Sequence, residues 1–362
     1  MPVTYRLIPP TELNAPLLQR WREIQGSSAA YSSPYFCPEF TLAVAQVRRD
    51  VRIAVIEDDN GKVSGFFPHQ RSWLGRGRPV GGPFSDYHGV IVEPQCRWDL
   101  KALLRAARLS VWTFDHLVGD TTKFEPYARA VASSPQIDLS QGYEKFEQGR
   151  RQAGSDFTRK TLGLARKLER EVGPLRFVFH EPGALDPLIA WKSAQYRQAH
   201  PAGRDLVFTN DWTIGLLRRI VDVQNADFAG VCSALYAGDR LLAAHMGMRS
   251  RSDLHYWFPA YEPQYSKYST GSILLLRLAE AAAAQGIHTI DLGKGDSQYK
   301  RTLMTGAASL MEGAVELPSL LSFVRGVTRA AEARESEGGA LGKTLSVPLR
   351  LVRRIDRSRR FV

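Results

Sequence analysis

The spacing of hydrophobic and polar positions predicts alternating helices and strands in the first part of the chain. Residues 51–57 and 62–70 are rich in Val, Ile and Phe and are predicted to form two strands. The sequence between them, Asp58-Asp59-Asn60-Gly61, predicts a hairpin turn, because Asn-Gly tolerates the positive φ angles that such turns need. Further strands are expected at 90–92 and 110–118, and helices at 17–25, 40–49 and 98–108.

The second part continues this alternation with longer helices. Residues 145–171 have helical spacing and a basic face, and Gly173-Pro174 is expected to end that helix. The other expected elements are helices at 184–198, 211–224 and 272–285 and strands at 175–180, 230–237, 241–249, 253–259 and 287–292. Strands joined first by short turns and then through a helix indicate a mixed α/β sheet.

The two parts resemble each other. VRIAVIEDDNGKVSGFFPHQRS in the first and VCSALYAGDRLLAAHMGMRS in the second both predict a hairpin with a histidine near the end of its return strand. A loop, a helix and a strand follow each hairpin. A duplicated mixed α/β domain explains both the length and the repeat. We therefore expect a first half at 1–142, a second half at 143–317 that carries the functional site, and a basic amphipathic helical tail at 318–362.

The composition is that of a globular protein. Of the 362 residues 44% are hydrophobic and 23% are charged, and no apolar run reaches the roughly 18 residues that a membrane span needs. The three cysteines are scattered, which argues against a disulfide framework, and no Cys-x-x-Cys or His-rich cluster suggests a metal. The N-terminus has no signal-peptide pattern. We therefore expect a cytoplasmic protein without a bound metal.

Positive charge is concentrated at the C-terminal end. The chain carries a net charge of +11, and residues 317–362 hold 10 Lys/Arg against 4 Asp/Glu, a net of +6. The other 316 residues therefore carry only +5. In the tail, Leu349, Leu351, Val352 and Ile355 alternate with arginines, which is typical of a basic amphipathic segment. Such a tail suits an anionic partner, namely a membrane surface such as the inner membrane face, a nucleic acid or an acidic protein, or it is a simple solvated end.

The start of the helix 272–285 is a candidate anion site. Ser269 or Thr270 could cap this helix, and Gly271 would allow a close approach to the backbone. Free N–H groups and the positive end of the helix dipole favour a pyrophosphate there. An ordinary capped helix would give the same pattern.

A second candidate follows the strand 287–292. Gly293 and Gly295 flank Lys294 directly after the strand, and glycines in this position usually mark a bend or a close backbone approach. The polar residues Asp291, Asp296, Tyr299 and Lys300 lie in or near this loop. They predict a site at the end of the strand, or a solvated loop.

These pieces together carry a resemblance to a known family. The stretch HYWFPAYEPQYSKYSTGSILLLRLAEAAAAQGIHTIDLGKGDSQYKRTL resembles the signature of the GNAT acetyltransferases grouped with the cellulose-biosynthesis protein CelD. Its most specific part is Asp-x-Gly-x-Gly-Asp followed by Tyr-Lys, from Asp291 to Lys300. The resemblance extends over roughly residues 30 to 310 and includes PYFCPEF and SDYHG in the first half. Thr270 stands where the family pattern leads us to expect proline.

The resemblance implies a fold, a donor and a set of binding residues. The fold would be a tandem GNAT, which the Fem-type aminoacyltransferases share, and the co-substrate acetyl-CoA or another acyl-CoA. The thioester would lie between the strands 253–259 and 287–292. The pyrophosphate and neighbouring groups would be bound by seven residues: Tyr268, Ser269, Thr270, Gly271, Ser272, Gly293 and Gly295.

Catalysis would consist of positioning, carbonyl polarisation and proton transfer. His245 has a side chain whose ordinary pKa suits a general base, but in the apolar stretch AAHMGM it could equally be a core residue. Asp291 is the other candidate base, or it anchors the loop, because a carboxylate in an apolar strand needs a partner. Tyr299 could protonate the leaving thiolate, and Lys300 could pair with Asp296 or bind a phosphate.

Three functions remain open at this stage. The first is N- or O-acyl transfer to a saccharide or lipid-linked precursor in polysaccharide or cell-envelope synthesis. The second is a Fem-like aminoacyltransferase that uses aminoacyl-tRNA, for which the basic face from Arg159 to Arg170 would suit RNA phosphates. The third is a non-catalytic assembly factor of a membrane polysaccharide machine, which the tail would fit equally well.

Overall fold

The structure is a computed structural model that describes residues 3–119, 121–199, 208 and 210–318. It divides into two compact units, each assembled from separate stretches of the chain. The first unit contains the described residues of 1–20, 48–130 and 311 onward, and the second contains 21–47 and 131–310. The tail predicted at 318–362 lies outside the described residues, apart from Pro318.

The first unit is a mixed sheet with a helix packed on it. Its strand order is β1-β2-β3-β4-β6-β13, with β5 beside β3, and only β4 and β6 run parallel among these pairs. The bounds are β1 Thr4–Ile8, β2 Val51–Glu57, β3 Val63–Arg71, β4 Arg76–Arg78, β5 Ile91–Val92, β6 Val111–Leu117 and β13 Gly306–Glu316. Helix α3 (Leu100–Ala106) is capped by Asp99, which accepts a hydrogen bond from the backbone N–H of Ala102. Trp98, Trp112, Phe114 and Phe124 pack together in the core.

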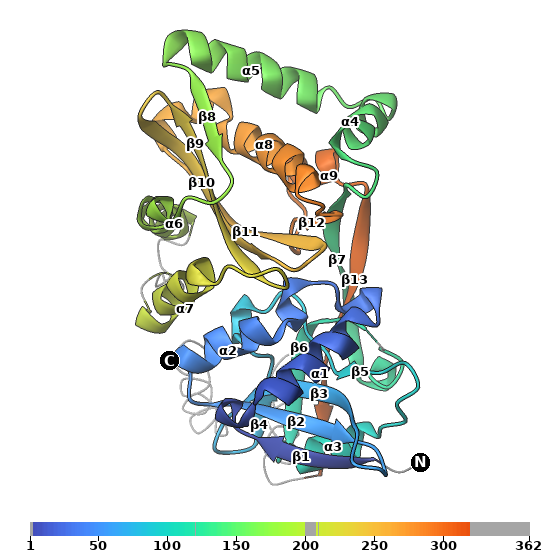
Figure 1. Cartoon of the computed structure of the whole chain (residues 1–362). Coiled ribbons are helices and arrows are strands. Elements are labelled where there is room, and N and C mark those ends of the chain that lie inside the picture. Colours follow the sequence, from blue (N-terminus) through green and yellow to red (C-terminus); the bar gives the residue numbers. More distant parts are fainter. Residues whose placement is uncertain (1–2, 120, 200–207, 209, 319–362) are drawn as a thin grey trace, which may run out of the picture. The chain divides into compact units, whose positions relative to one another are not determined.

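The second unit has the strand order β7-β12-β11-β10-β9-β8, in which only β11 and β12 run parallel. Helices α5 and α8 lie on one side of the strands β8 to β11, and α6 and α7 lie on the other (Figure 1). The strand bounds are β7 Ala128–Asp138, β8 Leu175–Val178, β9 Ala229–Ala237, β10 Arg240–Arg249, β11 Asp253–Tyr261 and β12 Thr289–Asp291. Helix α1 (Ala15–Gly26) begins in the first unit and ends in the second. The other helices of the second unit are α2 Pro38–Val47, α4 Tyr143–Gln152, α5 Phe157–Glu171, α6 Leu185–Ala199, α7 Asp211–Asp222, α8 Thr270–Ala284 and α9 Gln298–Leu303.

Most sequence-predicted elements are present within a residue or two of their expected bounds. The hairpin of β2 and β3 forms as predicted, and Gly61 in its turn has φ +75°. One expectation is wrong: residues 145–171 form two helices, α4 and α5, because the chain turns at Gly154 with φ +79°. The strands β1, β4, β7 and β13 and the short helix α9 were not predicted.

The compact units differ in kind from the halves expected at 1–142 and 143–317. The segment 21–47 precedes the predicted boundary but packs in the second unit, and residues from 311 onward belong to the first. The compact units are defined by which residues pack together, whereas the predicted halves are defined by a repeat in the sequence. The division into related halves therefore stays a prediction.

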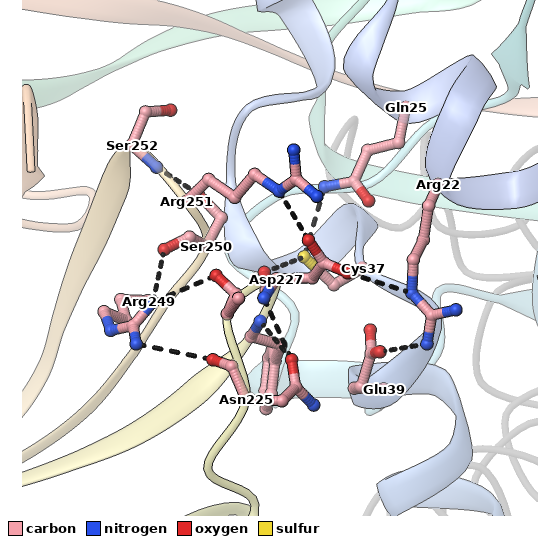
Figure 2. Close-up of polar contacts among 12 residues, drawn as sticks. Arg22, Gln25, Cys37, Glu39, Asn225, Asp227, Arg249, Ser250, Arg251 and Ser252 are labelled. Carbon is pink, nitrogen blue, oxygen red and sulfur yellow. Dashed lines mark hydrogen bonds and ion pairs between the residues drawn. The ribbon is translucent and has the colours of Figure 1, made fainter. Parts of the chain in front are cut away.

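Polar contacts attach the segment 21–47 to the rest of the second unit (Figure 2). Arg22 binds Glu39 at 2.6 Å and also Asp227, which in turn pairs with Arg251. Cys37 is buried, accepts a hydrogen bond from the Gln25 amide and lies 3.6 Å from the carbonyl oxygen of Asp227. Burial raises the pKa of the Cys37 thiol to about 12, so it stays protonated.

Candidate functional site

The central feature of the second unit is a fork between two parallel strands. β11 and β12 pair only where Asp253, Leu254 and His255 face Thr289, Ile290 and Asp291. β12 then ends, while β11 continues to Tyr261. Among the described residues, the second half of β11 therefore has no parallel strand paired with it.

On its other side, β11 is bent by an irregularity in its pairing with β10. The register shifts between Met246 and Met248, which leaves Gly247 at the irregular position. A Cβ atom there would lie 2.2 Å from the carbonyl oxygen of His255. Only glycine fits this close approach, and β-bulges of this kind commonly occur beside active sites.

Asp291 and His255 close the narrow end of the fork. The His255 Nδ1 lies 3.2 Å from Asp291 Oδ1, and both side chains are buried. Asp291 also accepts hydrogen bonds from the Ser134 hydroxyl (2.8 Å), the Gln136 amide (3.2 Å) and the backbone N–H of Gly293 (2.8 Å). The partners that a carboxylate in an apolar strand requires are thus present, and they tie β7, β11 and β12 together.

His245, the other candidate base, is buried in the sheet. Its ring stacks on Tyr256 with centroids 4.2 Å apart, and its Nδ1 lies 3.3 Å from the Ser233 hydroxyl. Burial, with a smaller effect of His255, lowers the pKa of His245 well below its ordinary value. The imidazole is therefore neutral at pH 7 but is a weak base. Its Nε2 has no hydrogen-bond partner among the described residues.

The loop after β12 brings several predicted residues together. Gly293 (φ +76°) and Gly295 (φ +122°) both adopt angles that side chains disfavour. The Lys300 ammonium donates to the carbonyl oxygens of Gly293 (2.9 Å) and Lys294 (3.1 Å), and Asp296 is paired with Arg301 at 2.7 Å. Lys300 thus fixes the course of this loop.

Tyr299 lies beside this loop on α9. Burial raises the pKa of Tyr299, and burial, with a smaller effect of Tyr299, raises the pKa of Tyr256 well above its ordinary value. The two phenols are therefore neighbours, and Tyr256 stacks on His245. Tyr299 remains protonated at neutral pH, which is the form that could give a proton to a leaving thiolate.

The start of α8 differs from the capped helix that the sequence suggested. Ser269 sits at the N-cap with φ +54° and its side chain makes no capping hydrogen bond. Thr270 is already inside the helix, and its buried hydroxyl has no hydrogen-bond partner within the described part of the chain. Capping by either hydroxyl is thus not observed, which leaves the first N–H groups of the helix without that partner.

The other residues at the start of α8 have distinct surroundings. Tyr268 is buried and its hydroxyl donates to Glu171 (2.6 Å), so its side chain is engaged with α5. Ser269 is exposed, and Gly271 and Ser272 are partly exposed. A Cβ on Gly271 would contact only Tyr261, the last residue of β11, at 3.6 Å. The helix therefore starts beside the open end of the fork.

Two residues at the fork were missed by sequence reasoning. His255 was passed over because nothing in the sequence showed that it would face Asp291. Lys192, on α6, donates a hydrogen bond to the carbonyl oxygen of Pro259 (2.9 Å) in the open stretch of β11. Burial, and then the charge of Lys300, lowers the pKa of Lys192 to about 8. A lysine between apolar positions of a predicted helix was the available clue.

Comparison with known proteins agrees with this architecture. Residues 156–301 match the family described as "Acetyltransferase (GNAT) domain". That segment includes the fork, α8 and the loop after β12. No curated protein matches the chain.

Solved structures resemble the chain over most of its length. FemX is 10% identical with a TM-score of 0.55, covering 82% of this chain and 94% of that one. The C-terminal domain of a putative lysylphosphatidylglycerol synthetase from Agrobacterium fabrum is 10% identical with a TM-score of 0.50, covering 86% and 96%. L-PGS from Bacillus licheniformis is 12% identical with a TM-score of 0.50, covering 87% and 96%. At these identities the likeness concerns the fold.

The expected mixed α/β fold class is thereby confirmed, and the second unit has a GNAT-like arrangement of strands and helices. The match of residues 156–301 to a GNAT acetyltransferase domain supports the enzyme class acyltransferase. No helix in the described residues is long and apolar enough to cross a membrane.

Proposed function

We propose that the second unit transfers an acyl group from acetyl-CoA, or another acyl-CoA, to an amine or hydroxyl of a second substrate. The observation that supports this most is the fork, because β11 continues for six residues, Tyr256–Tyr261, after its pairing with β12 ends. An extended donor could lie along this open backbone with its thioester near the narrow end.

The start of α8 supports the same placement of the donor. A helix of 15 residues presents free N–H groups and a positive dipole end at its first turn. Gly271 leaves room above that turn, and the buried Thr270 hydroxyl has no hydrogen-bond partner within the described part of the chain. A pyrophosphate would be bound by the residues from Ser269 to Ser272. The backbone of Tyr268 could contribute, while its side chain is engaged with Glu171.

Each predicted catalytic residue has surroundings that bear on its role. Tyr299, kept protonated by its raised pKa, could donate to the thiolate that leaves when the C–S bond breaks. Lys300 would hold the loop of Gly293 and Gly295 in place. Asp291 would position His255, and the low pKa of His245 makes it a weak base.

The acceptor class is inferred from sequence resemblance. The motifs from Pro259 to Lys300 resemble those of the CelD-like group, so we propose membership of that group and an acceptor in polysaccharide or cell-envelope synthesis. A saccharide or lipid-linked precursor with a free amine or hydroxyl would fit. The basic tail would then hold the protein at the inner membrane face.

An aminoacyl-tRNA donor is the second candidate, and one feature favours it. On α5, Arg159, Lys160, Arg166, Lys167 and Arg170 are all exposed, and such a row of cations suits a phosphate backbone. A third candidate is a scaffold that has kept the fold without catalysis.

Calorimetric titration of the full chain with acetyl-CoA tests the first candidate. We expect saturable binding that is lost in Gly271→Trp, because the indole would fill the space above the first turn of α8, and weakened in Lys300→Ala, which releases the loop after β12. Gly163→Trp is the control, because Gly163 lies on α5 and a Cβ on this helical glycine meets nothing within 4 Å.

The outcomes separate the candidates. Binding that Gly271→Trp abolishes and Gly163→Trp preserves would support acyl-CoA as the donor. Absence of binding at millimolar acetyl-CoA would contradict it. A titration with aminoacyl-tRNA would then decide between the second candidate and the scaffold.

A further inference from the structure

One lysine is held on each side of the fork in the second unit. Lys192 reaches β11 from α6 and donates to the carbonyl oxygen of Pro259, four residues beyond the last pair that β11 forms with β12. Lys300 reaches the end of β12 from α9 and donates to the carbonyl oxygens of Gly293 and Lys294. Burial, and then the charge of Lys300, lowers the pKa of Lys192.

The surroundings of Lys192 favour its neutral form. The Lys192 side chain is partly buried, its amine donates a hydrogen bond to a backbone carbonyl, and its Nζ lies 5.9 Å from the centroid of the Tyr196 ring. No carboxylate lies within 4 Å of it among the described residues. Glu262, which follows β11 directly, accepts a hydrogen bond from the indole N–H of Trp191 and not from Lys192.

Among the charged groups near α6, Lys300 alone contributes to the pKa shift of Lys192. The elements packed against α6 carry other titratable groups that add nothing to it: Asp253, His255, Tyr256 and Tyr261 on β11, and Arg240, His245 and Arg249 on β10. Burial and a neighbouring cation both disfavour the ammonium. With a pKa of about 8, a substantial fraction of Lys192 is neutral near physiological pH.

The other candidate bases are less suitable. His245 stacks on Tyr256 within the sheet and has a pKa lowered well below its ordinary value. His255 and Asp291 are engaged with each other at 3.2 Å. Lys192 belongs to α6, and α6 and α8 lie on opposite sides of the strands β9 to β11 (Figure 1). An acceptor could therefore meet it without displacing a donor bound at the start of α8.

We propose that Lys192 is the general base of the transfer, and this inference rests on the function proposed above. The acceptor's lone pair forms a bond to the thioester carbonyl carbon, and the proton that its amine or hydroxyl loses passes to neutral Lys192. The C–S bond then breaks, and the thiolate of CoA takes a proton. That proton comes either directly from the Lys192 ammonium or from Tyr299, and in the second case the Tyr299 phenolate is reprotonated by the Lys192 ammonium through solvent. The net products are the acylated acceptor and free CoA, with Lys192 unchanged.

The test uses the donor alone, so it needs no knowledge of the acceptor. A neutral amine beside a bound thioester becomes acylated itself when no acceptor is present. We incubate the full chain with acetyl-CoA from about pH 6.5 to 9.5 and map acetylated lysines by mass spectrometry. Lys192 should be modified at least about tenfold faster than the exposed Lys101, with a rate that rises through about pH 8 and levels off above it.

Two variants make the test specific. Gly271→Trp, which blocks the donor position, should reduce modification of Lys192 to the rate of Lys101. Lys300→Met removes the neighbouring charge and should move the midpoint of the pH dependence upward, a change that a merely structural lysine would not show.

Failure of the inference is distinguishable from failure of the proposed function. If acetyl-CoA binds in calorimetry but Lys192 is modified no faster than Lys101, or with the same pH dependence, Lys192 is not the base. If acetyl-CoA does not bind, the proposed donor is wrong and the inference falls with it.

Discussion

At the residue scale, the fork depends on a buried carboxylate with several partners. Asp291 is hydrogen-bonded to Ser134, Gln136 and the backbone of Gly293 and faces His255. Removing the Asp291 carboxylate would leave several buried hydrogen-bond donors without an acceptor, and each unsatisfied donor costs free energy because it has lost its contact with water. The structural role of Asp291 is therefore well supported, whichever residue proves to be the base.

Asp291→Ala should reduce the free energy of unfolding by about 3 kcal/mol, as for a buried pair that loses one partner. Urea denaturation followed by tryptophan fluorescence measures it. Asp296→Ala is the matched control in the same loop, because the Asp296–Arg301 pair is exposed and should contribute less than about 1 kcal/mol. Equal effects of the two substitutions would contradict the assignment of Asp291 as the buried anchor.

A buried histidine in the first unit makes a pH-dependent contribution. The Nε2 of His88 accepts hydrogen bonds from the backbone N–H groups of Asp115 and His116, each at 3.3 Å, so the ring must be neutral. Burial lowers the pKa of His88 from 6.5 to about 3. The unfolded chain therefore binds a proton below pH 6.5 that the folded chain does not bind until about pH 3.

Stability should consequently fall as the pH drops below 6.5, by about 2 kcal/mol between about pH 6.5 and 4.5 from His88. His88→Gln keeps an acceptor but does not titrate, so its unfolding free energy should vary less with pH over this interval. Urea denaturation at both pH values measures the difference. Parallel pH profiles for the two proteins would contradict this account.

At the element scale, the break between α4 and α5 illustrates how one residue divides a helix. The periodicity of 145–171 is continuous, yet Gly154 adopts φ +79° and the chain turns. Gly163, inside α5, has an ordinary helical φ, and a Cβ atom added to it would meet nothing within 4 Å. The backbone at Gly154 therefore favours glycine, whereas the backbone at Gly163 accepts a residue with a side chain.

Gly154→Ala should destabilise the protein by about 1 kcal/mol, since a Cβ disfavours the left-handed conformation. Gly163→Ala should stabilise it by about 0.5 to 1 kcal/mol, because alanine loses less backbone entropy in a helix. Thermal unfolding of both variants provides the comparison. The same sign for both would contradict the assignment of the helix break to Gly154.

At the scale of the whole molecule, the uneven charge suggests how the protein reaches its substrate. More than half of the net charge of +11 lies from residue 317 onward. A basic amphipathic segment is attracted to anionic lipids and also buries apolar side chains at the interface. An acceptor that is lipid-linked would then be encountered at the same surface.

A chain that ends at Pro318 should lose binding to vesicles that contain anionic phospholipid, whereas the full chain should sediment with them. Binding of the full chain should weaken as salt is raised, because screening reduces its electrostatic part. Vesicles of neutral lipid serve as the control. Equal sedimentation of both chains would argue against a membrane role for the tail.

The sequence by itself determined the α/β class, the β2–β3 hairpin and most of the helices, because these depend on local periodicity and on turn residues such as Asn60-Gly61. It also indicated the loop of Gly293 and Gly295, whose positive φ angles require glycine. Motif resemblance pointed to the acyltransferase class, which the match over residues 156–301 supports.

Only the tertiary structure decided which side chains meet. The pairing of His255 with Asp291 follows from the parallel register of β11 and β12, strands separated in sequence by α8. Lys192 reaches Pro259 because α6 packs on β11, 67 residues away in the chain. His245 has an ordinary pKa that suits a base, but burial lowers that pKa. Register, burial and long-range packing are collective properties, and they are the reason that the sequence indicated a site while the structure selected the residues within it.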